Sequence, residues 1–357
     1  WIIDRLRSEW YQYNSAISVE SIKKSDIIWI VAPWLWKKIR KKHLIDKKVV
    51  CSIYHLEEKD FEPKQIEDFN KRDSFVDIYH VISLKTKKEL GKITNKKIIY
   101  IPFWGNQNTW YEIHDKEKLR KKYDIPVDAY VLGSFQRDTE GSDLKSPKLI
   151  KGPDRLVKII KSKNEESNKL IVLLSGKRRQ YVIKELENLN IDYRYFEMVD
   201  TKVLNELYNC LDLYIVSSRL EGGPQAIIEC GLSKTPIIST NVGIASEFLH
   251  SNSLFDMDNF QNAIPNTEYA YEKSKQYLSE KDSAEFRSNL DNYALRHIIQ
   301  RFPVLNCTAS GFTEDNTMRE LDEYIRYCGD LRSAYDKKHG EVREATDKIN
   351  DIKRRLS

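Results

Sequence analysis

The sequence predicts an α/β protein of two doubly wound, Rossmann-like lobes with a cleft between them, followed by a C-terminal helical extension. Short runs rich in Ile and Val alternate with longer amphipathic stretches, which is the pattern of βα units that build a parallel sheet. This alternation breaks once, near residues 103–126, and then begins again. The length of 357 residues also suits two lobes and an extension, since single domains usually have roughly 100–200 residues.

The expected N-terminal lobe covers residues 1–115. The chain opens on Trp1-Ile2-Ile3-Asp4-Arg5, which is typical of a helix. The strand and the Gly-rich loop that usually begin a doubly wound lobe are therefore not found, and we expect a short segment to precede this sequence. The predicted strands are 27–31, 49–53, 78–82 and 98–101, with helices near 65–72 and 85–92.

The expected C-terminal lobe covers residues 116–300. Phe103-Trp104-Gly105-Asn106 has the composition of a loop, and the charged helix that follows ends at Ile125-Pro126. The βα rhythm then resumes, which places the lobe boundary in this break. The predicted strands are 130–134, 169–174, 193–196, 213–216 and 236–239, and the predicted helices are 153–163, 179–189, 202–210 and 224–232.

Residues 301–357 are predicted to form amphipathic helices. Apolar residues from Met318 to Leu356 recur mostly at steps of three, four and seven inside a very charged stretch. Such helices either close the fold or pair with another chain, so self-association through this extension stays open.

Charge and cysteine content exclude several classes of protein. The net charge of +5 is modest and spread along the chain, so we interpret the Lys-rich pieces as solvated helix faces. No aromatic-basic motif supports nucleic-acid binding. The five cysteines are odd in number and lack C-x-x-C spacing, which argues against a disulfide framework and against a zinc site. A reducing cytoplasm fits this pattern best.

No apolar run approaches the ~20 residues needed to span a bilayer, and no signal peptide opens the chain. We therefore expect a cytoplasmic protein whose contact with a membrane, if it has one, is peripheral and at the inner face. A basic surface attracts anionic lipid headgroups through its long-range field.

The most informative stretch is Ser217-Ser218-Arg219-Leu220-Glu221-Gly222-Gly223-Pro224-Gln225-Ala226-Ile227-Ile228-Glu229. It follows a buried strand and leads into a helix that begins near Pro224. Free backbone N–H groups and the positive end of the helix dipole meet there, which makes a site for phosphate. Glu221 and Glu229 bracket the turn, and a carboxylate accepts paired hydrogen bonds from vicinal hydroxyls. A tight βα connection with a surface Glu221 is the alternative interpretation.

This arrangement resembles the E-x7-E signature of the retaining glycosyltransferases of family 4, which have the GT-B fold. The resemblance is clear from about residue 130 to about residue 250 and faint in the first lobe. It implies that Glu229 binds the donor ribose and that Glu221 binds the transferred sugar. Donor contacts are implied for the amides of Gly223, Gln225 and Ala226, and for Gly222, Pro224, Gly133, Ser134 and Phe196; Pro224 has no N–H to donate.

The resemblance also implies a basic pair that clamps the diphosphate. Arg137 ends Gly133-Ser134-Phe135-Gln136-Arg137, and Lys151-Gly152 precedes the next helix. Two cations opposite a helix N-terminus neutralise charge on the leaving group, so no metal is required and no cofactor is expected. The two lie further apart than in the family, which indicates an inserted loop at 138–150 and makes Lys148 a rival for the lysine role.

In the first lobe, His55 follows a predicted strand at the carboxyl edge, where open α/β sheets place ligands. The family commonly has a histidine there that contacts the donor sugar. His80 is interpreted as a packing residue. Trp34 or Trp104 is expected to line the acceptor cleft, because aromatic faces stack on sugars.

Taken with the resemblance, the sequence predicts a retaining, metal-independent glycosyltransferase of the hexosyltransferase type. The donor would be a UDP- or GDP-linked sugar, and the acceptor a hydroxyl of a glycan or a lipid-linked saccharide, as in polysaccharide biosynthesis. A sugar-nucleotide epimerase or glycoside phosphorylase of the same fold is one alternative. A catalytically silent binding or scaffold protein is another.

Overall fold

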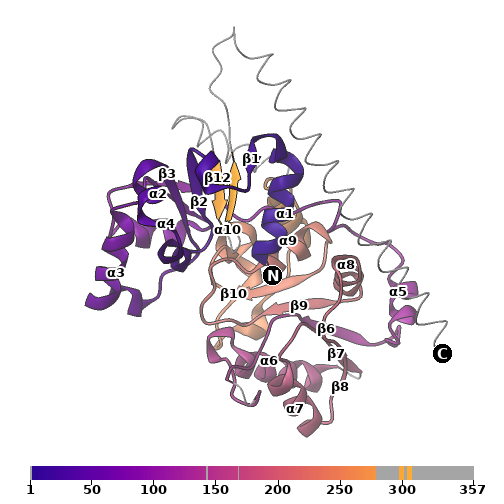
Figure 1. The fold of residues 1–357 in the computed structure, drawn as a ribbon. Coiled ribbons are helices and arrows are strands. Elements are labelled where there is room, and N and C mark those ends of the chain that lie inside the picture. The colour runs from indigo at the N-terminus through magenta and orange to yellow at the C-terminus, as the bar shows by residue number, and fades with distance from the viewer. Residues whose placement is uncertain (1, 142–143, 168, 279–296, 301–303, 308–357) are drawn as a thin grey trace, which may run out of the picture. The chain divides into compact units, whose positions relative to one another are not determined.

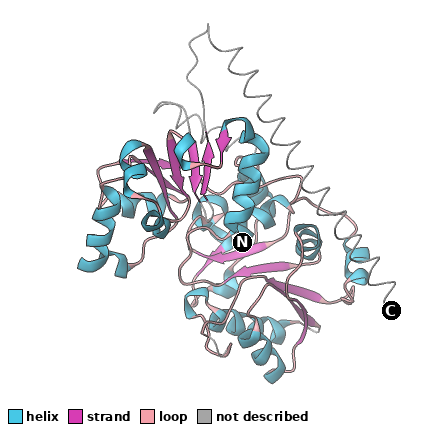
Figure 2. Ribbon diagram, in the orientation of Figure 1, coloured by secondary structure: helices cyan, strands magenta, loops and turns pink. Residues whose placement is uncertain are grey.

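The computed structural model describes residues 2–141, 144–167, 169–278, 297–300 and 304–307. They form two α/β lobes, each built around its own sheet (Figures 1 and 2). The helices are α1 (Ile2–Asn14), α2 (Lys41–Asp46), α3 (Pro63–Asp73), α4 (Leu84–Leu90), α5 (Lys116–Lys122), α6 (Pro153–Glu166), α7 (Gln180–Asn188), α8 (Thr201–Asn209), α9 (Gln225–Leu232), α10 (Ala245–Phe248) and α11 (Thr267–Ser274).

The first sheet has its core in four consecutive parallel strands, in the order β2-β3-β4-β5. The middle strands are buried along most of their length, which explains their continuous runs of Ile, Val and Tyr. The strands of this sheet are β1 (Ser18–Val19), β2 (Ile27–Ile30), β3 (Lys48–Ile53), β4 (Ile78–Val81), β5 (Lys97–Tyr100), β12 (His297–Gln300) and β13 (Val304–Cys307).

The two last strands change the expected division of the chain. Strand β12 pairs in parallel with β2, residue His297 opposite Ile27, and β13 runs antiparallel to β12. The sequence interpretation assigned 297–300 to the second lobe and 304–307 to a helical extension, whereas the pairing places both strands in the first sheet. The physical reason is that β2 has an open edge, and its free N–H and C=O groups are satisfied there by a strand from far along the chain. The expected helices at 308–357 lie outside the described residues.

The second sheet has six parallel strands in the order β11-β10-β9-β6-β7-β8 (Figure 1). Alternate residues of its strands point to opposite faces: Ile171 and Leu173 of β7 pack with α8 and α9, whereas Val172 and Leu174 pack with α6 and α7. The lobe is therefore doubly wound, as predicted. Its strands are β6 (Tyr130–Ser134), β7 (Leu170–Ser175), β8 (Asp192–Phe196), β9 (Leu213–Val216), β10 (Ile237–Thr240) and β11 (Leu254–Phe255).

The predicted strands and the interior helices are confirmed, with boundaries that differ by no more than a few residues. Strand β9 has the predicted limits, and α6 begins at the predicted Pro153. Local periodicity identified these elements because each buries a regular set of apolar side chains.

The strand order reverses between β9 and β6, since β7 and β8 lie on one side of this pair and β10 and β11 on the other. In open α/β sheets, ligands bind outside the carboxyl ends of the strands at such a switch point. Ser134 ends β6, and Ser217 follows β9, so these residues mark the switch point. None of the helices in the described part of the chain is long and apolar enough to cross a membrane.

Candidate functional site

The segment Lys151-Gly152 lies directly on the end of β9. Gly152 has φ +64°, and a Cβ at this position would lie 1.9 Å from the carbonyl oxygen of Ser217. The Ser217 hydroxyl donates to the carbonyl oxygen of Gly152 at 2.8 Å. Only glycine permits this left-handed backbone at such a close approach. The contact fixes where the neighbouring Lys151 side chain begins.

Lys151 and Glu221 form an ion pair at the switch point, with Nζ and Oε1 2.5 Å apart. The same carboxylate oxygen accepts from the Ser218 hydroxyl at 2.9 Å. Gln136, which follows β6, donates to the carbonyl oxygen of Lys151 at 2.9 Å. The side chains come from both sides of the strand-order reversal, so the structure brings together residues that the sequence analysis selected separately.

Two further cations stand beside this pair. Burial lowers the pKa of the Lys148 ammonium, and its proximity to Arg137 and Lys151 lowers that pKa further. Within the described residues, no ion pair or side-chain hydrogen bond satisfies the side chain of Lys148 or of Arg137. Lys148 thus lies near two other cations, Arg137 and Lys151, and near two carboxylates, Glu140 and Glu221. Of the two carboxylates, Glu221 is paired with Lys151, so donors remain on Arg137 and Lys148 that suit an anion.

The fold of residues 138–150, the predicted inserted loop, explains why Lys148 lies near Arg137. The amide of Lys148 donates to the carbonyl oxygen of Asp138 at 2.7 Å, and Thr139 forms an isolated bridge with Pro147. The segment after Arg137 therefore folds back on itself and returns Lys148 to the carboxyl edge of β6.

The turn before α9 differs in detail from the expectation. The helix begins at Gln225, and Pro224 precedes its first turn without a side-chain cap. Within the described residues, the amides of Gly223, Gln225 and Ala226 have no acceptor in the protein. A Cβ on Gly222 would lie 2.6 Å from the carbonyl oxygen of Tyr54, so this glycine accommodates the first lobe as well as any ligand. Gly223 likewise faces Ile82 and Phe103.

Glu229 is already engaged by the protein. Its side chain is buried, and Oε1 accepts from Nη1 of Arg5 at 2.6 Å. Oε2 accepts from the Tyr208 hydroxyl at 2.6 Å. The second nitrogen of Arg5, Nη2, donates to Oε1 of Gln225 at 2.5 Å. Sequence reasoning missed Arg5 and Tyr208, because no local pattern links the first helix to a carboxylate 224 positions away.

Glu9 extends this cluster along α1. Its Oε1 lies 3.9 Å from Nε of Arg5, and its Oε2 accepts from the indole of Trp104 at 2.8 Å. Burial raises the pKa of the Glu9 carboxyl to about 7, and the nearby Glu229 raises it further, while Arg5 and the Trp104 hydrogen bond oppose the rise. Glu9 is therefore protonated more readily in the folded chain than in the unfolded chain.

We expect replacement of Glu9 by glutamine to change how stability depends on pH. The ordinary pKa of 4.5 applies to the unfolded chain and about 7 to the folded chain, so the folded wild type holds a proton that the unfolded chain releases. Its stability therefore falls as the pH rises through this window. Glu9→Gln should gain about 2–3 kcal/mol over the wild type between about pH 5 and about pH 8. Urea unfolding of both proteins across this pH range measures their difference in stability. A difference that stays the same at every pH would contradict the raised pKa of Glu9.

Of the histidines in the first lobe, His55 is exposed, with Nε2 3.5 Å from Oε1 of Glu57. It follows Tyr54, whose carbonyl oxygen contacts the Gly222 turn, so His55 lies next to that turn. His80 is buried: Nε2 donates to the carbonyl oxygen of Ile101, and Nδ1 accepts from the Ser52 hydroxyl, both at 2.8 Å. Burial lowers the pKa of His80 to about 4, which fits the predicted packing role.

The remaining predicted donor residues lie along the same carboxyl edge. Gly133 lies inside β6, and a Cβ there would be 2.2 Å from Leu211, so its small size serves packing. Ser134 is fully buried, and Nη2 of Arg179 donates to its hydroxyl at 3.4 Å. Phe196 ends β8, two strands beyond β6, and packs edge-on against Tyr123.

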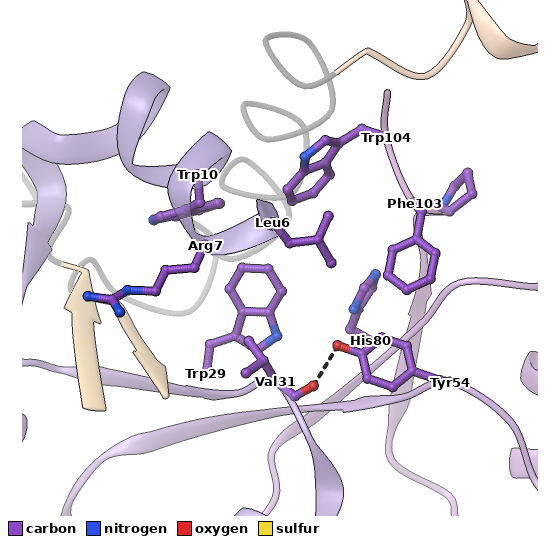
Figure 3. Close-up of a pocket in the computed structure, with 10 residues that line it drawn as sticks. Leu6, Arg7, Trp10, Trp29, Val31, Tyr54, His80, Phe103 and Trp104 are labelled. Atoms are coloured by element: carbon purple, nitrogen blue, oxygen red, sulfur yellow. Dashed lines mark hydrogen bonds between the residues drawn. The ribbon is translucent and has the colours of Figure 1, made fainter. Parts of the chain in front are cut away.

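A narrow apolar pocket lies under α1 in the first lobe (Figure 3). Its volume of about 20 Å³ has room for about one water molecule. Trp104 is buried in its wall, whereas Trp34 is 66% exposed. The residues that line it are Leu6, Arg7, Trp10, Trp29, Val31, Tyr54, His80, Pro102, Phe103 and Trp104.

Among the described residues, no group of three or more His, Cys, Asp or Glu side chains is arranged to hold a metal ion. The cysteines at 51, 210 and 230 are buried and not joined in disulfides.

Solved structures with this fold are numerous. Sucrose-phosphate synthase from Thermosynechococcus elongatus superposes with a TM-score of 0.60 at 14% identity, covering 75% of this chain and 73% of that one. Anabaena HepE in complex with UDP and glucose superposes with a TM-score of 0.58 at 13% identity, covering 75% of this chain and 78% of that one. A glycosyltransferase from Rickettsia africae superposes with a TM-score of 0.55 at 20% identity, covering 75% of this chain and 76% of that one.

The comparison with curated proteins found no match. The family model of glycosyl transferases group 1 matches residues 145–297, the part of the chain that contains Lys151, the Gly222-Gly223 turn and both glutamates. The second lobe therefore carries a glycosyl transferases group 1 region, and the described chain has the GT-B fold of glycosyltransferases.

Proposed function

We propose that this protein is a retaining glycosyltransferase of family 4, which transfers a hexose from a nucleotide-sugar to a hydroxyl acceptor. One observation carries the proposal. Lys151 pairs with Glu221 at the switch point of the second sheet, Lys148 lies near Lys151 and Arg137, and the unbonded amides that open α9 follow Glu221 in the chain. Cations and helix-terminal amides in one corner are the groups that bind a diphosphate.

The cations are assigned to the diphosphate. Arg137 and Lys148 keep N–H donors without a protein acceptor in the described part of the chain, and Lys151 shares its charge with Glu221. When the glycosidic bond breaks, negative charge grows on the departing phosphate, and positioned donors stabilise that charge. This arrangement supplies the charge without a metal ion, so we propose metal-independent transfer.

The acidic residues are assigned to hydroxyl groups. Glu221 is held by Lys151 and Ser218 and would accept from hydroxyls of the transferred sugar. Glu229 would accept from the ribose. His55, exposed beside the Gly222 turn, would contact the sugar from the first lobe. Gly223, Gln225 and Ala226 would donate their amides to the diphosphate, and Phe196 would contact the donor further along the edge.

For retention, we propose the front-face route, in which the leaving phosphate accepts the proton of the incoming hydroxyl. Both oxygens of Glu229 accept hydrogen bonds within the protein, and Oε1 of Glu221 is paired with Lys151, so the proposal gives neither carboxylate the role of nucleophile. The protein then contributes placement of donor and acceptor and stabilisation of the leaving group. The acceptor is proposed to be a hydroxyl of a glycan or of a lipid-linked saccharide.

The donor nucleotide is proposed to be UDP- or GDP-linked. The UDP found with Anabaena HepE makes UDP the first candidate to test. A thermal-shift screen of UDP, GDP and ADP is the direct experiment, because a ligand that binds only the folded chain stabilises it. We expect one of them, at a concentration about 100 times its Kd, to add about 2.7 kcal/mol of stability. If none of the three shifts the melting temperature, the donor site is wrongly assigned.

Variants then test the assignment of residues. Glu229→Ala and Arg137→Ala should each lower transfer at least ~10-fold, which corresponds to ~1.4 kcal/mol of lost transition-state stabilisation. Lys161→Ala on the exposed face of α6 is the control, and its activity should equal that of the wild type. Unchanged turnover in both site variants would reject the site. Full nucleotide binding without any transfer would favour the silent binding protein.

A further inference from the structure

Arg5 of α1 contacts helix α9 directly. Its two terminal nitrogens donate to two acceptors on α9, Oε1 of Glu229 at 2.6 Å and Oε1 of Gln225 at 2.5 Å. The guanidinium also lies over the ring of Trp110, with Cζ 5.3 Å from the ring centroid. The hydrogen bond to Glu229 joins two charged groups, and such bonds are roughly twice as strong as neutral ones.

The contact uses the same oxygen atoms that the proposed function gives to the donor. A ribose presents two neighbouring hydroxyls that both donate to one carboxylate. The guanidinium of Arg5 presents two neighbouring N–H groups and occupies Oε1 of Glu229, while Tyr208 occupies Oε2. Both oxygens of Glu229 therefore have donors before any nucleotide arrives.

The surroundings leave little room for a second ligand at this carboxylate. Glu229 is 6% exposed, and the side chain of Arg5 is 19% exposed. On the neighbouring stripe of α1, Leu6 and Trp10 cover the apolar pocket of the first lobe (Figure 3). The same helix, α1, therefore covers the apolar pocket and, through Arg5, pairs with Glu229, the proposed ribose carboxylate.

We propose that Arg5 is an internal pseudo-ligand that holds the donor site closed until a nucleotide displaces it from Glu229. The inference rests on the proposed function, because it takes Glu229 as the ribose carboxylate. In this scheme the nucleotide binds only the fraction of molecules in which Arg5 has left, so the apparent Kd is the intrinsic Kd divided by that fraction. Removing the guanidinium should therefore tighten binding, whereas removing a true ligand contact weakens it.

The test compares UDP binding by calorimetry in the full chain and in three variants. Arg5→Ala should bind UDP at least ~10-fold more tightly than the wild type, as expected if no more than about a tenth of the wild-type molecules are open. Arg5→Gln keeps one donor nitrogen but no charge, so its affinity for UDP should lie between those of the wild type and of Arg5→Ala. Arg7→Ala is the matched control on the same helix, since Arg7 makes no ion pair among the described residues and should leave the Kd unchanged.

Two readouts keep the result interpretable. Hydrogen exchange of the α1 amides should rise in Arg5→Ala without nucleotide, and in the wild type on addition of UDP. Arg5→Gln also covers the case in which alanine leaves Glu229 buried and unpaired and the chain does not fold. Equal or weaker UDP binding by folded Arg5 variants overturns the inference alone. Absence of binding to UDP, GDP and ADP in every protein, including the wild type, overturns the proposed function, and the inference with it.

Discussion

Replacing Lys151 by alanine should lower sugar transfer by about 10²–10³-fold, the loss seen when one preorganised donor to a developing negative charge is removed. The ammonium of Lys151 lies 2.5 Å from Glu221, and its backbone is held by Gln136 and by the Gly152 contact with β9. Without this ammonium, the negative charge of Glu221 is no longer compensated near the proposed phosphate site. One substitution then affects both the proposed stabilisation of the leaving group and Glu221, the carboxylate proposed to bind the sugar.

The measurement is release of the nucleoside diphosphate from the donor identified by the thermal-shift screen, with kcat and KM determined separately. A loss confined to kcat indicates a contact made only in the transition state. Lys148→Ala, measured in parallel, decides which lysine serves the phosphates, and Lys161→Ala is the solvent-exposed control. A Lys151 variant with wild-type kcat/KM, together with an inactive Lys148 variant, would transfer the role to Lys148.

Gly152→Ala should destabilise the protein by about 2–5 kcal/mol, through a left-handed backbone that costs alanine roughly 1–2 kcal/mol and an overpacked contact that costs about 1–3 kcal/mol. The new Cβ would lie 1.9 Å from the carbonyl oxygen of Ser217. Because the position of a Cβ is fixed by its own backbone and the oxygen belongs to another, no side-chain rotation relieves the clash. The segment must move away from β9, and Lys151 moves with it.

Gly91→Ala is the matched control for this substitution. Gly91 follows α4 with φ −63°, and an added Cβ would meet only the carbonyl oxygens of Lys87 and Lys88, at 3.4 and 3.6 Å. The unfolding free energy of this variant should be within about 1 kcal/mol of that of the wild type, because alanine fits a helical conformation and restricts the unfolded chain. Urea unfolding of both proteins gives the comparison. Equal stability of the Gly152 and Gly91 variants would show that the Lys151 segment is not fixed by this contact.

The basic residues show how far sequence reasoning reached at the site. The motif context selected Arg137 and Lys151 and indicated an insertion between them, and the folded chain brings them into one cluster. The sequence named Lys148 as a rival of Lys151 but could not show that it lies near both, because its position depends on how the segment after Arg137 folds back on Asp138. A spacing along the chain gives no direction in space for a loop of this kind.

The glycine turn shows a different limit. Its sequence indicated a backbone that a ligand could approach closely, and the amides before α9 are indeed without acceptors in the described structure. The immediate neighbours of Gly222 and Gly223 nevertheless come from the first lobe: Tyr54, Ile82 and Phe103. A glycine reports close approach by some group, and only the packed structure identifies that group.

The sequence by itself determined the alternation of strands and helices, the doubly wound class and the position of the glycine turn between β9 and α9, because these depend on side-chain periodicity and turn chemistry within short windows. Tertiary structure decided the contacts between residues that lie far apart in the sequence. Strand β12 completes the edge of β2 from 270 residues away, and Arg5 reaches Glu229 across 224 residues. Such pairings follow from which open edges and buried charges must be satisfied once the chain is compact, so the partners become identifiable only after folding.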